Sequence, residues 1–336
     1  MFLEKLHKQK YRQNDIMMTS LTPDGEYIKN LEDIHFTPIF ILGQARSGTS
    51  LIYNMLSLTK SFNYLTLYHI IFYDQIIYNH INKIEDLVKN QFENYLKKHN
   101  IIDRVIDKTR INADLAEEYQ FLLLQKAGSR QIAPKSLPAF IEMARKIQFI
   151  SENSKPLLIK TPSDFPNFIF IKKAFPNAKF IFIHRHPLRI LNSNRIAGRA
   201  LYYNKSLYYA MLDMDYNRIH KNPLSRYIIK KYYSKSFILG LIFDTRGVVK
   251  AIKNFLNNIN KLSKEDYINV KYEDLCKDPN KTIDEIMNFL SLESREKIDY
   301  KSLISPRNLP IENNAIKMQK MIYKSIKNYF DFFGYK

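Results

Sequence analysis

The sequence predicts an α/β fold in which a short parallel sheet is flanked by helices in three layers and carries a mostly helical insertion. Short runs of Ile, Phe and Leu alternate with stretches of helical periodicity along the chain. This alternation is typical of parallel sheets whose strands are joined by right-handed helical crossovers. The first run also ends in a glycine-containing turn that opens a helix. With 45% hydrophobic residues among 336, the chain can bury a substantial core.

Four segments have the composition of buried strands, and turns or helix starts follow them. They span residues 38–42, 157–160, 179–184 and 268–272. After the first segment, Gly43 begins a turn, and Leu51, Ile52 and Met55 then recur at helical spacing. Pro187 follows the third segment, where the first turn of a helix accommodates proline. The strand ends are therefore the expected places for loops that carry function.

We expect a single domain over residues 1–336, with three segments outside the run of strands. Residues 1–36 form an N-terminal extension, residues 60–150 are mostly helical, and residues 196–243 form an insertion crowded with Tyr, Lys and Arg. The insertion has no strand periodicity. It is predicted to resemble a lid, whereas a simple packed helical insertion is the alternative.

The net charge of +19 favours an anionic partner. Nucleic acid, a membrane surface and a charged small substrate all fit this charge, so charge alone does not choose among them. The single cysteine, Cys276, excludes an intramolecular disulfide and a cysteine metal cluster. No secretory leader or membrane-spanning run of apolar residues is apparent, so we expect a cytoplasmic protein.

The segment after the first strand has the outline of a phosphate-binding loop, and the fold is therefore expected to be P-loop-like. Two glycines five positions apart and a pair of hydroxyl residues precede a helix. In such a turn the backbone N–H groups and the helix N-terminus converge on an anion, and glycine allows close approach. The expected binding residues are Gly43, Arg46, Ser47, Gly48, Thr49 and Ser50.

This loop differs from that of nucleoside-triphosphate hydrolases. Those proteins place a lysine where Thr49 stands, and that lysine contacts the terminal phosphates. Here Arg46 carries the cation inside the loop. The shift argues against hydrolysis of ATP or GTP and for a ligand that presents a single 5′ phosphate-like group.

A second anion-binding element is predicted at Arg185 and Ser193. Arg185 follows the third strand, and ligands of open α/β sheets bind at the carboxyl ends of the strands. The guanidinium fork suits a phosphate, and Ser193 on the following helix adds a hydroxyl. Together with the loop, this element predicts a ligand with two separate anionic groups.

These elements resemble the sulfotransferases that depend on 3′-phosphoadenosine 5′-phosphosulfate (PAPS). The resemblance rests on the loop, Lys160-Thr161-Pro162, the segment 175–180, Arg185 with Ser193, and Tyr272-Glu273-Asp274-Leu275, in their order and spacing. It covers roughly residues 37–335 and is strongest for the broad bacterial-type group related to tyrosylprotein sulfotransferases, because the loop reads Arg-Ser-Gly-Thr. It implies transfer of a sulfuryl group to an acceptor hydroxyl of a carbohydrate, a lipid, another small molecule or a peptide tyrosine.

The resemblance also implies roles for individual residues. The loop from Arg46 to Ser50 would hold the 5′-phosphosulfate, and Arg185 and Ser193 the 3′-phosphate of PAPS. Lys160 would lie near the reacting sulfuryl group, and Arg46 would share its catalytic role. Tyr272 would shape the adenine end of the pocket or cap its strand. The products would be the sulfated acceptor and adenosine 3′,5′-bisphosphate, and the chemistry requires no metal.

The acceptor hydroxyl must lose its proton to a general base. Glu117 and Glu118 are the candidates, since they form an acidic pair in an apolar stretch of the region 60–150, which would lie on the acceptor side. His69 and Asp107 are the alternatives. Tyr119 follows the pair at a position where a further acidic residue was expected.

Two other classes of function stay open at this point. The first is a P-loop nucleotide kinase or NTPase-like protein, which shares the loop outline. The second is a non-enzymatic basic protein that binds nucleic acid or a membrane through the insertion. The enzyme interpretation expects no nucleic acid partner and leaves room for peripheral contact with a membrane.

Overall fold

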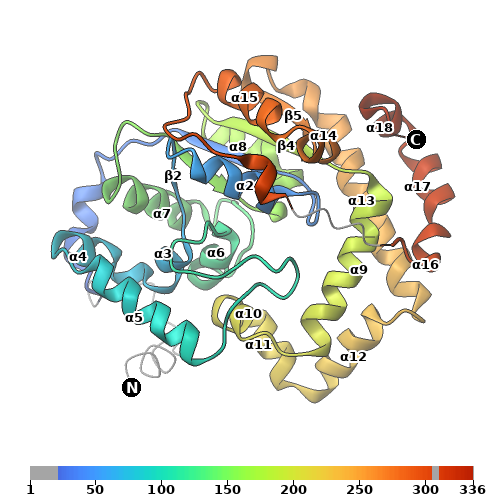
Figure 1. Cartoon of the computed structure of the whole chain (residues 1–336), viewed down its shortest axis with the longest axis horizontal. Coiled ribbons are helices and arrows are strands. Elements are labelled where there is room, and N and C mark those ends of the chain that lie inside the picture. Colours follow the sequence, from blue (N-terminus) through green and yellow to red (C-terminus); the bar gives the residue numbers. More distant parts are fainter. Residues whose placement is uncertain (1–21, 305–309, 336) are drawn as a thin grey trace.

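The computed structural model describes residues 22–304 and 310–335, and its centre is a wholly parallel sheet of five strands (Figure 1). The strand order is β2-β3-β1-β4-β5. The strands are β1 (Pro38–Leu42), β2 (Asn63–Tyr64), β3 (Leu157–Lys160), β4 (Lys179–His184) and β5 (Tyr267–Lys271). The α/β prediction and its parallel sheet are confirmed.

Two details differ from the expected strands. β2 was not predicted, because two residues form no apolar run; it lies at the sheet edge, beside β3. β5 ends at Lys271, so Tyr272 begins helix α14 (Tyr272–Lys277) instead of ending a strand.

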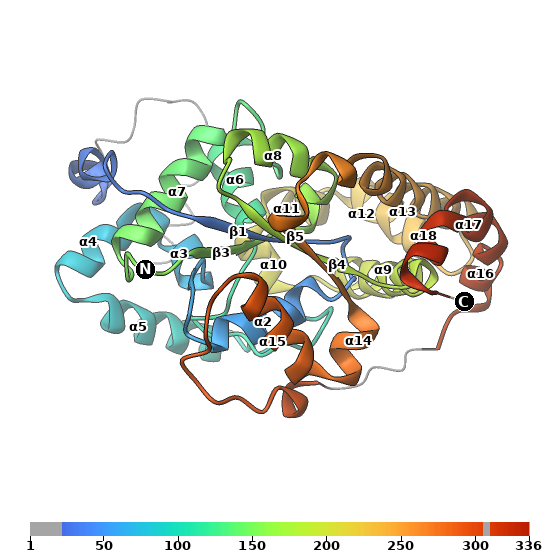
Figure 2. The same ribbon diagram turned by 90° about the horizontal axis from the view of Figure 1, so that it is seen from above.

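Helices cover both faces of the sheet (Figure 2). Successive residues of a strand point to opposite faces, and β1 shows this directly. Ile39 and Ile41 belong to an apolar cluster with residues of α2 (Thr49–Leu58) and α15 (Pro279–Phe289). Phe40 and Leu42 belong to a larger cluster with residues of α6 (Tyr119–Ala127), α7 (Leu137–Phe149) and α8 (Phe168–Ala174). The result is the expected arrangement of three layers.

The region 60–150 is mostly helical, as its sequence indicates. Besides β2, α6 and α7 it contains α3 (Leu67–Ile71), α4 (Ile76–Ile81) and α5 (Glu85–Lys98). Residues 1–21 of the expected N-terminal extension lie outside the described residues. Its remainder includes Asp24, which is fully buried and forms an ion pair of 2.9 Å with Lys146 of α7. This part of the extension is therefore integral to the core.

The segment 196–243 is helical throughout most of its length. It begins within α9 (Pro187–Tyr203), continues through α10 (Leu207–Leu212), α11 (Met214–Lys221) and α12 (Pro223–Tyr233), and ends within α13 (Ile238–Asn258). Its limits therefore fall inside helices. Whether it acts as a lid stays a prediction.

The C-terminal helices α16 (Asn313–Ile316), α17 (Gln319–Ser325) and α18 (Lys327–Phe333) lie along the outer side of α9 and α13 (Figure 1). His184, at the end of β4, contacts the ring of Phe333 and shares a hydrogen bond of 3.2 Å with Tyr329. The C-terminus thus covers one end of the sheet. Among the described helices, none has the length and apolar character needed to cross a membrane.

Candidate active site

The loop Gly43–Ser50 joins β1 to α2 and needs both of its glycines. Gly48 has a φ of 107°, in the left-handed region that side chains avoid. A Cβ at Gly43 would lie 2.6 Å from the carbonyl oxygen of Ile183, and one at Gly48 would lie 2.4 Å from the Tyr272 ring. Substitution at either position would push the loop away from β4 and α14.

The loop presents a set of donors for an anion. The N–H of Ser47 is bound to Gln44, and the carbonyl of Gly48 receives the N–H groups of Leu51 and Ile52. Among the described residues, the N–H groups of Gly48, Thr49 and Ser50 have no acceptor. The Ser47 hydroxyl is buried and also lacks a partner there. Unpaired donors at a helix N-terminus are the arrangement that binds phosphate-like groups.

Arg46 reaches from this loop toward α9. Its Nε atom donates to Oγ of Ser193 over 3.2 Å, and its Nη2 atom donates to the carbonyl of Ile106 over 3.1 Å. Burial lowers the pKa of Arg46, and the nearby guanidinium groups of Arg104 and Arg185 add to this effect. The structure thus places two predicted binding residues, Arg46 and Ser193, in direct contact.

Arg185, which follows β4, fixes the other side of the loop. Its Nη1 atom donates to the carbonyl of Arg46 over 2.9 Å, and its guanidinium lies 4.2 Å from the centre of the Tyr272 ring. No carboxylate of the described residues forms an ion pair with Arg46 or Arg185. Two cations without anionic partners at one loop are suited to a dianionic ligand.

Lys160 lies beneath the cavity at the end of β3, fully buried. Its Nζ atom donates to Oγ of Ser50 over 3.0 Å and to Oε1 of Glu118 over 2.5 Å. Glu118 also accepts a hydrogen bond from Gln120. The lysine therefore connects the loop with Glu118 of the acidic pair.

Glu117 has different surroundings from Glu118. It is 1% exposed, accepts a hydrogen bond from Tyr208, and lies 3.6 Å from Arg104. Burial raises the pKa of Glu117, and the Arg104 guanidinium only partly offsets this effect. Glu117 does not line the cavity, whereas Glu118 does. Glu117 thus makes structural contacts with Tyr208 and Arg104, whereas Glu118 forms part of the cavity wall.

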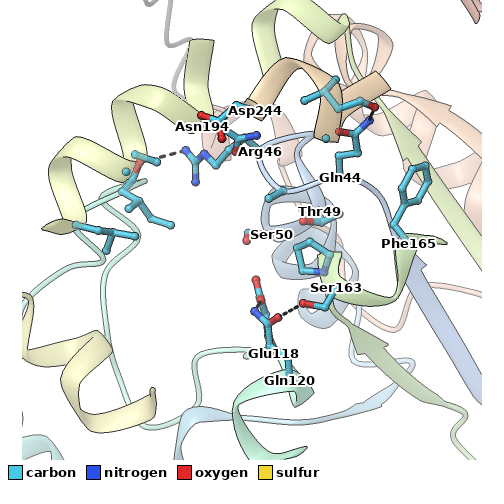
Figure 3. Close-up of a pocket in the computed structure, with 18 of the residues that line it drawn as sticks. Gln44, Arg46, Thr49, Ser50, Glu118, Gln120, Ser163, Phe165, Asn194 and Asp244 are labelled. Carbon is cyan, nitrogen blue, oxygen red and sulfur yellow. Dashed lines mark hydrogen bonds between the residues drawn. The ribbon is translucent and has the colours of Figure 1, made fainter. Parts of the chain in front are cut away.

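A cavity of about 570 Å³ lies above the loop (Figure 3). Its floor contains Arg46, Thr49 and Ser50, and one wall contains Glu118 and Arg104. The aromatic lining comes from α6, α9, α10, α12, α13 and the turn after β3: Phe121, Phe165, Tyr202, Tyr209, Tyr233 and Phe243. Asn194 and Asp244 add polar groups. Charged groups on the floor and aromatic side chains above make the cavity amphipathic.

The alternative general bases, His69 and Asp107, do not line the cavity. His69 forms a capping box with Thr66, whose N–H donates to Nδ1 of His69 over 3.1 Å. Burial lowers the pKa of His69 to about 3, and the residue does not line the cavity. Asp107 forms an ion pair of 3.1 Å with Arg104. Burial alone would raise the pKa of Asp107, but Arg104 and Thr109 lower it below its ordinary value.

Several cavity residues were missed by the sequence analysis. Arg104 is 4% exposed and donates from Nη2 to Ser50 over 3.4 Å, yet it lies in an irregular segment with no recognisable pattern. Asp244 lies on α13 and is paired with Arg195 at 3.1 Å. Tyr202 and Tyr209 lie in the segment 196–243, and its high content of Tyr was the available signal. In the described part of the chain, His, Cys, Asp and Glu side chains form no group that could hold a metal.

Fold and site together define an α/β protein with a phosphate-loop-like donor set beside an amphipathic cavity. The chain belongs to the sulfotransferase family, whose family model matches residues 38–227. Its fold is similar to that of sulfotransferase STF9 from Mycobacterium avium, with 12% identity, a TM-score of 0.63, and coverage of 91% of this chain and 80% of that one.

Sulfotransferase STF1 from Mycobacterium tuberculosis gives a second structural match. The identity is 15%, the TM-score is 0.58, and the match covers 93% of this chain and 82% of that one. These likenesses support the fold. The comparison with curated proteins finds no match.

Proposed function

We propose that this chain transfers the sulfuryl group of PAPS to a hydroxyl of an acceptor bound in the 570 Å³ cavity. The observation that carries the proposal is the position of Lys160. This buried cation bonds both Ser50 of the anion-binding loop and Glu118 of the cavity wall, at 3.0 and 2.5 Å. It therefore lies between the place for a donor and the place for an acceptor. Membership of the sulfotransferase family supports this interpretation.

The donor end of the proposal rests on two anion-binding elements. The N–H groups of Gly48, Thr49 and Ser50, which have no acceptor within residues 22–304 and 310–335, suit the 5′-phosphosulfate. Arg185 and Ser193 suit the 3′-phosphate, which simpler adenine nucleotides lack. Tyr272 would act through Arg185, whose guanidinium it stacks against. The two elements meet at Arg46, which contacts both Ser193 and Arg185.

In the transfer, a bond forms between the acceptor oxygen and sulfur while the bond between sulfur and the bridging oxygen of the donor phosphate breaks. Negative charge builds on that leaving oxygen, and adenosine 3′,5′-bisphosphate departs. The protein contributes alignment of the two oxygens and stabilisation of the developing charge. Lys160 and Arg46 are the cations proposed for this stabilisation, and Arg104 is a third because it bonds the same Ser50.

The acceptor proton goes to a carboxylate, and Glu118 is the proposed base. It lines the cavity, whereas Glu117 is buried behind it. Gln120 and Lys160 hold the Glu118 carboxylate in position. Glu117 is proposed as a positioning residue, because its carboxylate holds Arg104 and accepts from Tyr208.

The aromatic walls favour a small amphiphilic acceptor. A cavity of this size suits a ligand of a few hundred daltons. Phe121, Tyr202, Tyr209 and Phe243 offer apolar ring surfaces, while the charged groups lie at the floor, where the hydroxyl would react. A lipid or another small alcohol or phenol therefore fits better than a polar sugar.

The test follows ³⁵S from labelled PAPS into a panel of long-chain alcohols, sterols, phenols and sugars. Wild type is expected to label at least one apolar hydroxyl compound. Lys160→Met should lower the rate by about 100-fold or more, since it removes charge stabilisation in a buried site. Lys172→Met on α8, outside the cavity, serves as the matched control. Labelled product at equal rates from wild type and Lys160→Met, or no labelled product at all, would refute the proposal.

A further inference from the structure

One face of α13 lines the cavity, and another carries an unusual row of exposed side chains. Asp244, Gly247, Val248 and Ala251 line the cavity. The exposed row recurs at helical spacing and consists of Leu239, Phe243, Arg246, Lys250 and Lys253. Two apolar residues thus begin the row, and three cations continue it. We refer to these five residues as the α13 row.

The adjacent helix α12 has a similar exposed face. Leu224, Tyr227 and Ile228 are 67%, 63% and 57% exposed, and no residue of α12 is buried. The two helices pack closely, since a Cβ at Gly240 would lie 2.6 Å from the carbonyl of Tyr232. Large exposed apolar side chains gathered on two neighbouring helices mark an interaction surface.

The charged residues of the stretch of chain that contains these side chains are almost entirely cationic. Between residues 221 and 261 the sequence has nine Lys or Arg and one acidic residue, Asp244. Asp244 is turned inward, where it pairs with Arg195 and accepts from Tyr232. Arg246, Lys250 and Lys253 form no ion pair with a described carboxylate, and they line a hollow of about 270 Å³ beside Met321 of α17. The hollow suits anionic head groups.

We propose that the α13 row and the exposed face of α12 dock the protein on the surface of an anionic lipid bilayer. Exposed apolar side chains beside cations, in a stretch of chain whose one acidic residue is turned inward, have the composition of interfacial membrane-binding helices. Nucleic acid would account for the cations but leaves Leu224, Ile228 and Leu239 without a role. The bilayer is therefore the partner that the whole set of residues favours.

The proposed docking surface adjoins the cavity, because Phe243 belongs to both. Phe243 is 58% exposed and also lines the cavity, and Gly247 beside it is exposed as well. A protein docked through this surface would thus take its acceptor from the bilayer. The acceptor would be an amphiphile of the membrane that carries a hydroxyl group. This second step rests on the proposed function, whereas docking does not.

The test measures sedimentation of the full chain with vesicles, without donor, so its outcome is independent of sulfuryl transfer. The vesicles contain phosphatidylcholine alone or mixed with phosphatidylglycerol. Wild type is expected to bind the mixed vesicles at least about tenfold more strongly, and added salt should weaken this binding. Equal binding to both kinds of vesicle, or to neither, would overturn the proposal.

Two double variants locate the surface. Lys250→Glu with Lys253→Glu, and Ile228→Ser with Leu239→Ser, should each lower binding by about tenfold. The controls make the same changes on α5, which lies on the opposite side of the molecule (Figure 1), or shortly after its end: Lys97→Glu with Lys98→Glu, and Leu87→Ser with Ile102→Ser. Thermal melting confirms that each variant folds.

The variants also separate other partners. If the control variants lose as much binding as the α12–α13 variants, the contact is diffuse and the proposal is wrong. The protein could instead bind an RNA or DNA duplex and not vesicles. If that binding is salt-sensitive and survives the Ser substitutions, the cations serve nucleic acid and the proposal is wrong. A dimer in sedimentation velocity that the Ser substitutions abolish, again without vesicle binding, would assign the surface to a second copy.

Discussion

The Nε atom of Arg46 donates a hydrogen bond to Oγ of Ser193 over 3.2 Å, and this bond joins the loop after β1 to helix α9. From sequence, Arg46 was expected at the 5′ end of the donor and Ser193 at its 3′-phosphate. Their contact means that the two anion-binding elements are already held together before a ligand binds. The loop and α9 are therefore expected to respond to donor as one unit.

Ser193→Ala tests whether this hydroxyl serves the 3′-phosphate. We expect the affinity for adenosine 3′,5′-bisphosphate to fall by about tenfold or more, since a hydrogen bond to a charged group contributes about 1.5–3 kcal/mol. The affinity for 5′-AMP, which lacks the 3′-phosphate, should barely change. Calorimetric titration measures both. Equal losses for the two ligands would mean that Ser193 acts only through Arg46.

Tyr272 provides a test of the stacking contact with Arg185. Tyr272→Phe keeps the ring that lies 4.2 Å from the guanidinium, so bisphosphate affinity should stay within about twofold. Tyr272→Leu removes the ring, and the affinity should fall by about three- to tenfold, because a partly buried cation–π contact contributes roughly 1 kcal/mol. If the Phe variant loses as much affinity as the Leu variant, the hydroxyl and not the stacking matters.

The two carboxylates should separate in kinetics and stability. Glu118→Gln is expected to lower kcat by about 10²–10⁴-fold with little effect on bisphosphate binding, as loss of a general base does. Glu117→Gln should mainly lower the free energy of unfolding, by roughly 1–3 kcal/mol, because Arg104 and Tyr208 lose a buried charged partner. Turnover and urea unfolding measure these effects. The reverse pattern would exchange the two roles.

Stability should fall in acid partly because of His184. Burial lowers the pKa of His184 to about 3, while both ring nitrogens bond Tyr329 and Asn269. The unfolded chain takes up a proton near pH 6.5, so this contribution is fully present above that pH and is lost as the pH falls toward 3.

Each unit of pH in this window should cost about 1.4 kcal/mol through this one group. His184→Asn should therefore reduce the dependence of the unfolding free energy on pH by about that slope, relative to wild type. His35→Asn, the same change at an exposed position, is the matched control. Parallel slopes for wild type and His184→Asn, in urea titrations between pH 4 and 6, would contradict the assignment.

The fold was largely predictable because its strands are buried and clearly bounded. The Ile- and Phe-rich runs are followed by recognisable boundaries, such as Gly43 after β1 and Pro187 shortly after β4. Their alternation with helical segments indicates parallel strands. β2 escaped prediction because Asn63 and Tyr64 pair with β3 without an apolar run of their own. Tyr272 was placed in a strand since a helix start and a strand end look alike in sequence.

The site was predictable only where local rules apply. Carboxyl ends of parallel strands meet at one edge of the sheet, and this brought Arg46, Lys160 and Arg185 to one place. Arg104 and Asp244 were not foreseen, because tertiary packing alone carries them to the cavity. Which of Glu117 and Glu118 faces the cavity likewise depended on the path of the chain before α6.

Donor binding is measured most directly by a thermal-shift titration with adenosine 3′,5′-bisphosphate, 5′-AMP and magnesium-ATP, on wild type and Arg185→Ala. Arg218→Ala, which removes an exposed side chain of α11, is the control. A ligand that binds only the folded state raises the melting temperature. We expect a shift that is largest for the bisphosphate, persists in Arg218→Ala and disappears in Arg185→Ala. No shift with the bisphosphate, or a shift with magnesium-ATP alone, would contradict the proposed donor.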